Sequence, residues 1–194
     1  MPYIYSAKFN TGTNYGDGTD ENVLVRLYGF NEKIAGDYFC DYANKDDFEA
    51  RGTRHIYNLK VDEYIGEIER VLVYVRPFTS NFENCAWYLS SVEVKSTVDQ
   101  QTYTQTFKCE RWIGIPERCP ERPEVYRFVE CYPEGPKEYN TDPDGGRALS
   151  YPIRSVEGGS TYQCFNDPNW EKEKRTIINA SGGIDDYCEK WERP

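Results

Sequence analysis

The sequence predicts an all-β protein built as an antiparallel sandwich or barrel. Between residue 2 and about residue 114, short segments with alternating apolar and polar residues recur at strand-like spacing, which is typical of sandwiches and barrels. No stretch of useful length in this part has the 3.6-residue period of a helix. The composition agrees, because 17 tyrosines and four tryptophans stand against one methionine, and aromatic residues favour strands.

Six segments carry the alternation. They are YIYSAKF (3–9), NVLVRLYG (22–29), RHIYNLKV (54–61), IERVLVYVR (68–76), WYLSSVEVKS (87–96) and TYTQTFKC (102–109). The residues expected to face the core are Tyr3, Tyr5, Ala7, Phe9, Val23, Val25, Leu27, Val71, Val73, Val75, Trp87, Tyr103, Gln105, Phe107 and Cys109. In the fifth segment the parity changes between Leu89 and Val92, which predicts a β-bulge at Ser90-Ser91.

The regular strand pattern ends after residue 114, and the composition of the chain changes. Three prolines between Pro116 and Pro123 each fix a backbone angle and remove a donor, so residues 115–123 are expected to form a linker. Residues 124–194 are rich in loops and keep two short β-like pieces, VYRFVECY (125–132) and ALSYPIRSV (148–156). Few aliphatic residues are available there for a core, so this extension is expected to need disulfides or a neighbouring surface.

Charge narrows the range of partners. The net charge is −10, and the lysines and arginines are scattered singly, which argues against nucleic-acid binding. Binding to an anionic membrane would require a bridging cation or apolar anchors. No apolar run approaches the roughly 18 residues of a spanning helix.

The cysteines favour an extracellular protein, with a cytoplasmic one as the alternative. Seven cysteines leave at least one thiol free or paired outside the chain, which would allow a covalent oligomer. We expect at least one of Cys131, Cys164 and Cys188 to be disulfide-bonded, with Cys119 as a candidate to tie the linker to them.

Asn179-Ala180-Ser181 is a candidate glycosylation site. No signal peptide is visible, because a strand pattern begins at once; the chain is expected to be a mature or trimmed form, or else cytoplasmic.

The sequence predicts no catalytic activity. It contains no Gly-x-Ser-x-Gly motif, and its single histidine, His55, lies in a strand pattern where a structural role is expected. One histidine cannot supply the ligands of a histidine-rich iron site. The cysteine spacings contain no Cys-x-x-Cys pair, so zinc is not expected.

Two acidic loops predict a calcium site. NTGTNYGDGTDENV (10–23) combines three glycines with Asp17, Asp20 and Glu21, and DYANKDDFEARG (41–52) carries four further carboxylates. Loops separated by two or three strands can meet at one end of a sandwich, and two acidic loops would repel each other unless a cation lay between them. Carboxylates and backbone carbonyls are the hard oxygen ligands of Ca²⁺, whereas Mg²⁺ requires a tighter octahedron. The alternative is a pair of solvated acidic turns.

Several blocks resemble a known family. In order, TGTNYGDGTDENVLVRLYG, DDFEARG, IGEIERVLV, WYLSSVEV and FKCERWIG are similar to the PLAT domain, also called the lipoxygenase homology or LH2 domain. The resemblance covers about residues 2–114. It implies an eight-stranded β-sandwich that is not itself catalytic and that docks, with the help of Ca²⁺, to membranes or protein partners.

The resemblance also implies particular site residues. The metal ligands would be Gly16, Asp17, Gly18, Thr19 and Asp20 from the first loop, and Asp46, Asp47 and Glu49 from the second. One residue, Ala50, is inserted relative to the family pattern, which alters the shape of the second loop. The membrane or partner contacts would be Tyr15, Phe78 and Phe82 in the 78–82 loop, and Trp112. For Trp112, packing at the closing strand is the alternative.

Three functions follow as hypotheses. The first is a non-catalytic, calcium-dependent recognition module for phospholipid surfaces. The second is an extracellular protein-interaction or structural subunit that uses the sandwich as a scaffold. The third, weaker hypothesis is a regulatory part of a larger lipid-acting enzyme.

Overall fold

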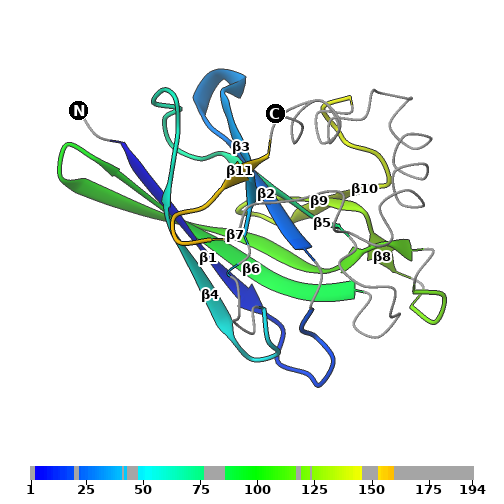
Figure 1. Ribbon diagram of the computed structural model, residues 1–194. Helices are drawn as coiled ribbons and strands as arrows, with labels where there is room; N and C mark the ends of the chain where they lie inside the picture. The colour runs from blue at the N-terminus through cyan, green and yellow to red at the C-terminus, as the bar shows by residue number, and fades with distance from the viewer. Residues whose placement is uncertain are drawn as a thin grey trace, which may run out of the picture.

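The computed structural model describes residues 3–19, 22–40, 42, 48–76, 86–116, 119–122, 124–145 and 153–159. Within these residues two β-sheets pack face to face as a sandwich (Figure 1). The first sheet has the order β4 (Thr53–Leu59), β1 (Ile4–Thr11), β6 (Ala86–Val98), β7 (Gln101–Gly114) and β8 (Val125–Tyr126). The second has the order β10 (Pro136–Tyr139), β9 (Phe128–Cys131), β5 (Arg70–Arg76), β2 (Asn22–Tyr28), β3 (Ile34–Phe39) and β11 (Arg154–Ser155).

The sheets are mixed. Neighbouring strands run antiparallel, except that β8 is parallel to β7 and β11 is parallel to β3. The helical structure among the described residues is a short 3₁₀ turn, η1 (Phe30–Glu32), and no helix there is long and apolar enough to cross a bilayer. The predicted all-β sandwich is therefore confirmed.

The core lies between the two sheets and follows the predicted alternation. Tyr5, Ala7 and Phe9 of β1 face the same side as predicted and are buried, whereas Tyr3 is 39% exposed. In β7, Phe107 and Cys109 are buried as predicted, but Tyr103 is 44% exposed and Gln105 is half-buried, so the prediction is wrong for these two residues. The predicted inward residues of β2 and β5 are also buried in this core; they are Val23, Val25, Leu27, Val71, Val73 and Val75. Trp87 is fully buried, as predicted, and its indole N–H donates a hydrogen bond to Thr11 Oγ1 at 2.9 Å.

The predicted bulge is present where β6 changes parity. Against β1, the pairing moves from Asn10–Ser91 to Thr11–Leu89, so Ser90 is the extra residue. Against β7, the pairing moves from Ser91–Lys108 to Leu89–Arg111, and Glu110 has a positive φ of 52°. The bulge explains how Trp87 and Leu89 and, beyond it, Val92 and Val94 all point into the core.

The second sheet departs from the prediction because both of its faces are buried. In β2 the alternate residues Leu24, Arg26 and Tyr28 are as buried as the core-facing ones. In β5, Leu72 and Tyr74 are likewise buried on that outer face. A strand buried on both faces has no solvated side, so this sheet carries further packing on the face away from the core.

The described part of the extension is built into both sheets. The two predicted β-like pieces contain β8, β9 and β11, while β10 forms where the sequence indicated a loop. β9 pairs with the edge of β5, and β10 pairs with β9. β3 was not predicted either. The boundaries 2–114, 115–123 and 124–194 stay a prediction.

Candidate functional site

The two predicted loops come together at one end of the sandwich. The Thr19 N–H donates to the Phe48 carbonyl at 3.1 Å, and the Arg51 N–H donates to the Gly12 carbonyl at 2.8 Å. Gly18 lies so close to the second loop that a Cβ there would be 2.8 Å from the Phe48 carbonyl oxygen. Glycine is required at this position because any side chain would separate the loops.

Asp17 braces the first loop from inside. Its side chain is buried, with 3% exposed, and Oδ2 accepts a hydrogen bond from the Asn14 N–H at 2.9 Å. The Asp17 N–H in turn donates to the Asn14 carbonyl at 3.1 Å. A Cβ on Gly12 would lie 2.2 Å from Asp17 Oδ2, so Gly12 makes room for this carboxylate. This arrangement was not predicted, although the repeated glycines around Asp17 were its signal in the sequence.

The other predicted ligands are only partly described. Gly16 has a positive φ of 89°, Thr19 is buried and Glu49 is exposed on the second loop. Asp20, Asp46 and Asp47 lie outside the described residues. Among the residues that are described, no three of His, Cys, Asp or Glu form a group that could hold a metal. The described donors at this end are hard oxygens on two touching loops, which fits Ca²⁺ chemically; the ligand set itself stays a prediction.

The predicted contact residues differ in environment. Tyr15 is fully exposed, at 100%, near the turn of the first loop. Trp112 is half-buried, with the Arg122 guanidinium 3.7 Å from its ring centroid and Tyr88 edge-on at 5.3 Å. Its packing therefore agrees with the alternative role at the closing strand. Phe78 and Phe82, together with Asn179, lie outside the described residues.

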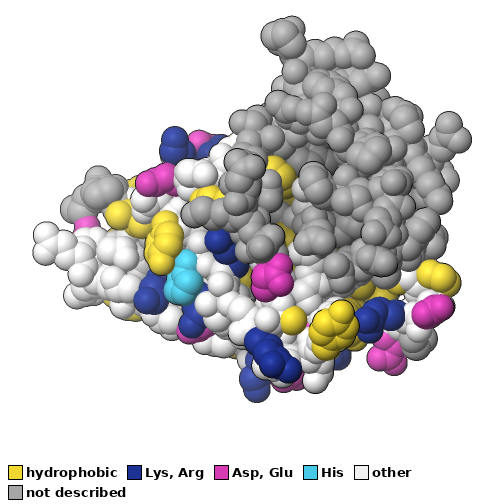
Figure 2. All heavy atoms as spheres, turned by 60° about the horizontal axis from the view of Figure 1, so that its bottom comes forward, with side chains coloured by type: hydrophobic (Ala, Val, Ile, Leu, Met, Phe, Trp, Pro, Cys, Tyr) yellow, Lys and Arg dark blue, Asp and Glu magenta, His cyan; other side chains and the backbone are white. Residues whose placement is uncertain are grey.

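The described surface at the lower end of the sandwich carries side chains of every charge type. Figure 2 shows hydrophobic, basic and acidic side chains interspersed there, with no continuous basic patch. His55 (cyan) lies on this face, exposed in β4 and stacked on Tyr57 with 5.6 Å between ring centroids.

Comparison with known proteins decides the family. The PLAT/LH2 domain family model matches residues 5–120, which is more than half of the chain and includes both loops. This chain belongs to the PLAT/LH2 family. The match also spans the strands that position the two loops, β1 to β7, so the predicted resemblance is confirmed.

Solved structures share the PLAT fold of this chain. A coral 8R-lipoxygenase, whose description is calcium activation via a C2-like domain, matches with a TM-score of 0.50 and 20% identity, over 70% of this chain and 17% of that one. A Delta413-417:GS lipoxygenase in complex with arachidonate matches with a TM-score of 0.50 and 18% identity, over 71% of this chain and 17% of that one. The chain thus matches only about a sixth of the length of these structures, and the likeness shows the fold alone.

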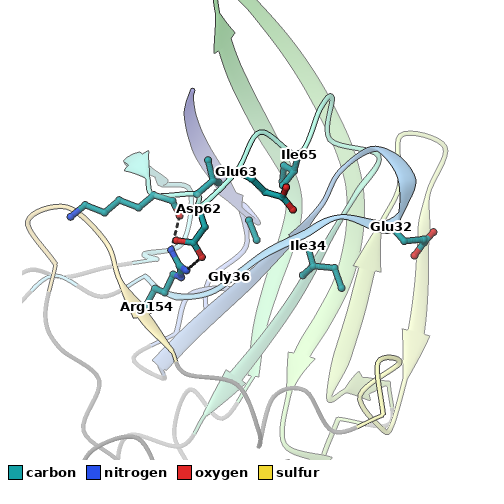
Figure 3. A pocket seen from close by; sticks show the side chains of 10 residues that line it. Glu32, Ile34, Gly36, Asp62, Glu63, Ile65 and Arg154 are labelled. Carbon is teal, nitrogen blue, oxygen red and sulfur yellow. Dashed lines mark hydrogen bonds and ion pairs between the residues drawn. The ribbon is translucent and has the colours of Figure 1, made fainter. Parts of the chain in front are cut away.

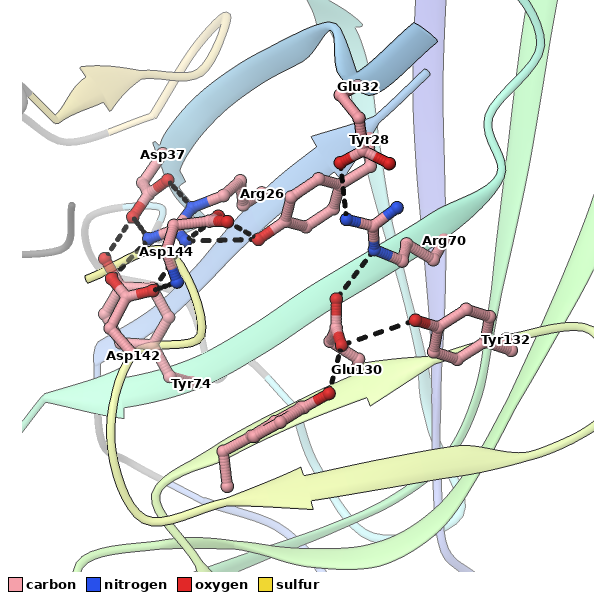
Figure 4. A network of polar contacts seen from close by, with 11 residues as sticks. Arg26, Tyr28, Glu32, Asp37, Arg70, Tyr74, Glu130, Tyr132, Asp142 and Asp144 are labelled. Atoms are coloured by element: carbon pink, nitrogen blue, oxygen red, sulfur yellow. Dashed lines mark hydrogen bonds and ion pairs between the residues drawn. The ribbon is translucent and has the colours of Figure 1, made fainter. Parts of the chain in front are cut away.

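A buried charge network occupies the outer face of the second PLAT sheet. Arg26, which is fully buried, donates to Asp37 at 2.7 Å, to Asp142 at 2.8 Å and to Asp144 at 2.7 Å (Figure 4). Burial lowers the pKa of Arg26, but Asp37 and Asp142 more than compensate and raise it. The network joins β2 and β3 to a turn of the extension, so it anchors the extension to the PLAT sandwich.

A charged pocket lies at the end of the sandwich opposite the two loops. It encloses about 410 Å³ between β3 and residues 60–65, with Arg154 of β11 at its edge (Figure 3). Arg154 bonds to Asp62 and reaches the Lys60 carbonyl at 3.4 Å. The lining combines two cations, Lys60 and Arg154, with three carboxylates, Glu32, Asp62 and Glu63, and Arg154 is already paired with Asp62.

The cysteines fall into two groups. Cys40, Cys109 and Cys131 are free and buried. Cys119 is disulfide-bonded, and because the other described cysteines are free, its partner lies outside the described residues. The expectation that one of Cys131, Cys164 and Cys188 is bonded now rests on Cys164 and Cys188, and stays a prediction.

Proposed function

We propose that this PLAT domain is a non-catalytic recognition module that docks to phospholipid surfaces with the help of Ca²⁺. The observation that carries the proposal is the direct contact between the loop 12–19 and the loop 48–52, beside a fully exposed Tyr15. Family membership supports it, and so does the calcium activation described for the C2-like domain of the coral lipoxygenase.

In this proposal the cation joins the loops and neutralises the rim. Carbonyls of residues 16–19 and the carboxylates of Asp46, Asp47 and Glu49 would hold Ca²⁺, with Asp17 and Asp20 adding negative charge. A chain of net charge −10 is repelled by anionic lipid unless a cation lies between them. Tyr15 and Phe82, with Trp112 at the edge, would then enter the interface, where aromatic rings are favoured.

Vesicle sedimentation tests the proposal. With phosphatidylserine vesicles, we expect the protein to sediment in millimolar calcium and to stay in solution in EGTA. Because each buried aromatic contributes about 1.5–3 kcal/mol, the double variant Tyr15→Ala/Phe82→Ala should bind at least about tenfold more weakly. The matched control Tyr57→Ala/Tyr103→Ala removes two rings that are 59% and 44% exposed away from the loops, and it should bind like the parent.

Two outcomes would contradict this function. If both double variants bind equally well, the loops are not the membrane face. If the parent does not sediment in calcium at all, membrane docking is wrong and the chain is better described as a protein-interaction subunit. Full binding in EGTA would remove the calcium requirement but leave docking in place.

The proposal also covers the location of the protein and its relation to a larger enzyme. The disulfide at Cys119 supports an extracellular location. The match to only 17% of each lipoxygenase structure supports the alternative that the chain regulates a larger lipid-acting enzyme. Sequencing the parent transcript would test that alternative, because it requires a catalytic domain on the same chain.

A further inference from the structure

An open groove lies at the end of the sandwich away from the calcium loops. Its volume is about 650 Å³, and it lies between the turn after β2, the loop 64–70 and the turn 132–134 that joins β9 to β10. β2 and β5 run antiparallel, with Asn22 opposite Arg76 at the loop end and Tyr28 opposite Arg70 at the groove end. A ligand in the groove would therefore bind at the opposite end of the sandwich from the loops.

Two aromatic rings form one wall of the groove, and the backbone fixes their positions. Phe30 is 60% exposed and Tyr64 is 37% exposed. The Phe30 N–H donates to the Ile65 carbonyl at 2.7 Å, and a Cβ on Gly66 would lie 2.8 Å from Phe30 Cβ. Tyr64 stacks on Tyr3 with 4.9 Å between ring centroids. These rings are held in place and open to a ligand.

The groove carries an excess of negative charge. Glu67, Glu69 and Glu134 are exposed on its rim, and none of them forms an ion pair with a described residue. Arg70, the cation of the lining, is already bound to Glu130 at 2.7 Å and to Glu32 at 3.1 Å (Figure 4). Its guanidinium also lies 4.0 Å from the centroid of the Tyr28 ring, so it is not available to neutralise the rim.

We propose that this groove binds a basic segment of a partner protein, with an arginine or lysine side chain held between the aromatic rings and the rim glutamates. A cation is attracted to the face of an aromatic ring, and a guanidinium also forms paired hydrogen bonds with carboxylates. The same rim would repel an anionic lipid or a nucleic acid. The site is independent of calcium, so the module would bind a membrane at one end and a basic partner at the other.

A peptide titration followed by ¹⁵N NMR tests this proposal. The probe is a short amidated peptide in which two arginines flank a tyrosine, titrated in EGTA so that the calcium loops play no part. We expect shifts at the Ile68 amide, whose N–H donates to the Gln105 side chain at 3.1 Å inside the groove, and at Tyr132. The same peptide with glutamate in place of arginine should cause no shift.

Matched variants locate the interaction. Glu67→Gln/Glu69→Gln should weaken binding at least about fivefold because it removes two of the charges that contact the cation. Phe30→Ala should weaken it about threefold or more through the lost ring contact. The control Glu121→Gln/Glu124→Gln removes two exposed carboxylates outside the groove and should weaken binding less than about twofold, the effect of net charge alone.

Clear results would overturn the inference. It is wrong if the arginine peptide causes no shift, if the glutamate peptide binds equally well, or if the control variant loses as much affinity as the groove variant. None of these results bears on the vesicle experiment, which probes the other end of the molecule in calcium.

Discussion

The Arg26 side chain is fully buried, so its guanidinium has lost all contact with water. Three carboxylates from two distant parts of the sequence surround its guanidinium, and Tyr74 also donates to Asp37 at 2.6 Å. Such a network contributes little compared with an apolar core, but removing one partner leaves uncompensated charge in a place that water does not reach. Arg26 should therefore be hard to replace.

Replacing Arg26 by methionine should destabilise the protein by about 3–5 kcal/mol. The change keeps the apolar stem but removes the Arg26 charge that faces the buried Asp37 and Asp142. Urea denaturation measures the free energy of unfolding. The control Arg154→Met breaks an exposed pair with Asp62 and should cost less than about 1 kcal/mol. Equal losses in the two variants would show that the buried network is not a stabilising unit.

Replacing Gly12 by alanine should destabilise the protein by about 1–3 kcal/mol, because the new Cβ overlaps the Asp17 carboxylate and Tyr88. The Asp17→Ala background removes one of the two obstacles, so the same substitution should cost less there. A double-mutant cycle of unfolding free energies measures that coupling. Strictly additive losses would mean that Asp17 does not occupy the space that Gly12 leaves.

For single residues, the sequence predicts features that depend on neighbouring residues better than contacts between distant segments. The glycine-rich acidic loop, its exposed Tyr15 and the buried Trp87 were predictable because neighbouring residues determine them. The role of Arg26 was not predictable, since its partner Asp142 lies 116 positions away. The inward turn of Asp17 also escaped prediction, because spacing does not show which way a carboxylate points.

At the scale of elements, alternation identifies strands but not what covers their second face. Val23, Val25 and Leu27 were placed correctly in the core, yet Leu24 on the other face of β2 is equally buried. β3 escaped prediction because its middle holds Gly36 and the buried Asp37, and its pairing with β2 shifts register there. The bulge in β6 was predictable, since its signal is a change of parity within one segment.

A pair of thiols meets between β7 of the first sheet and β9 of the second. The Lys108 N–H donates to the Tyr132 carbonyl at 2.9 Å in an antiparallel bridge, so Cys109 and Cys131 are the next opposing pair. Both are fully buried. A hydrogen bond with the Cys109 thiol, together with burial, raises the pKa of Cys131, which keeps it protonated and unreactive.

These thiols should resist alkylation in the folded protein. With iodoacetamide at neutral pH, we expect no labelling of Cys40, Cys109 or Cys131 in native buffer, and complete labelling in urea without a reductant. Cys119 should be labelled in urea only after reduction. Peptide mass spectrometry distinguishes the sites, and a cross-linked peptide containing Cys109 and Cys131 would contradict the free-thiol assignment.

At the scale of the whole molecule, one buried phenol, Tyr5, and one half-buried phenol, Tyr139, make the stability depend on alkaline pH. Burial raises the pKa of Tyr5 to about 12. Burial and a hydrogen bond to Glu130 raise that of Tyr139 to about 12. Both values exceed the ordinary tyrosine pKa of about 10, so folding favours the protonated phenols. Their contribution is complete below about pH 10 and is lost as the pH rises through about 12.

Replacing Tyr139 by phenylalanine should flatten this dependence. We expect the unfolding free energy of the parent to fall between about pH 10 and pH 12, and that of the variant to fall less steeply, because one shifted group is gone. Urea denaturation at several alkaline pH values, with absorbance at 295 nm to follow tyrosine ionisation, measures both slopes. Parallel curves would show that Tyr139 titrates alike in the folded and unfolded states.

We propose two functional ends for this molecule, and only one of them was predictable from the sequence. The meeting of the two acidic loops was predictable because their residues lie in two short segments with a family resemblance. The groove combines a turn after β2, a loop before β5 and a turn of the extension, so no single segment carries its signal. Its partner would be basic, which agrees with a net charge of −10.

Calorimetric titration with Ca²⁺ tests the central claim most directly, because the proposal requires the touching loops to hold that ion. We predict binding with a dissociation constant of about 10⁻⁴ to 10⁻³ M, as in extracellular modules. Asp47→Ala should weaken it at least about tenfold with the fold intact, while the charge-matched control Glu134→Ala, at the opposite end of the sandwich, leaves it unchanged. Absence of calcium binding up to several millimolar, or equal affinity in the two variants, would contradict the account.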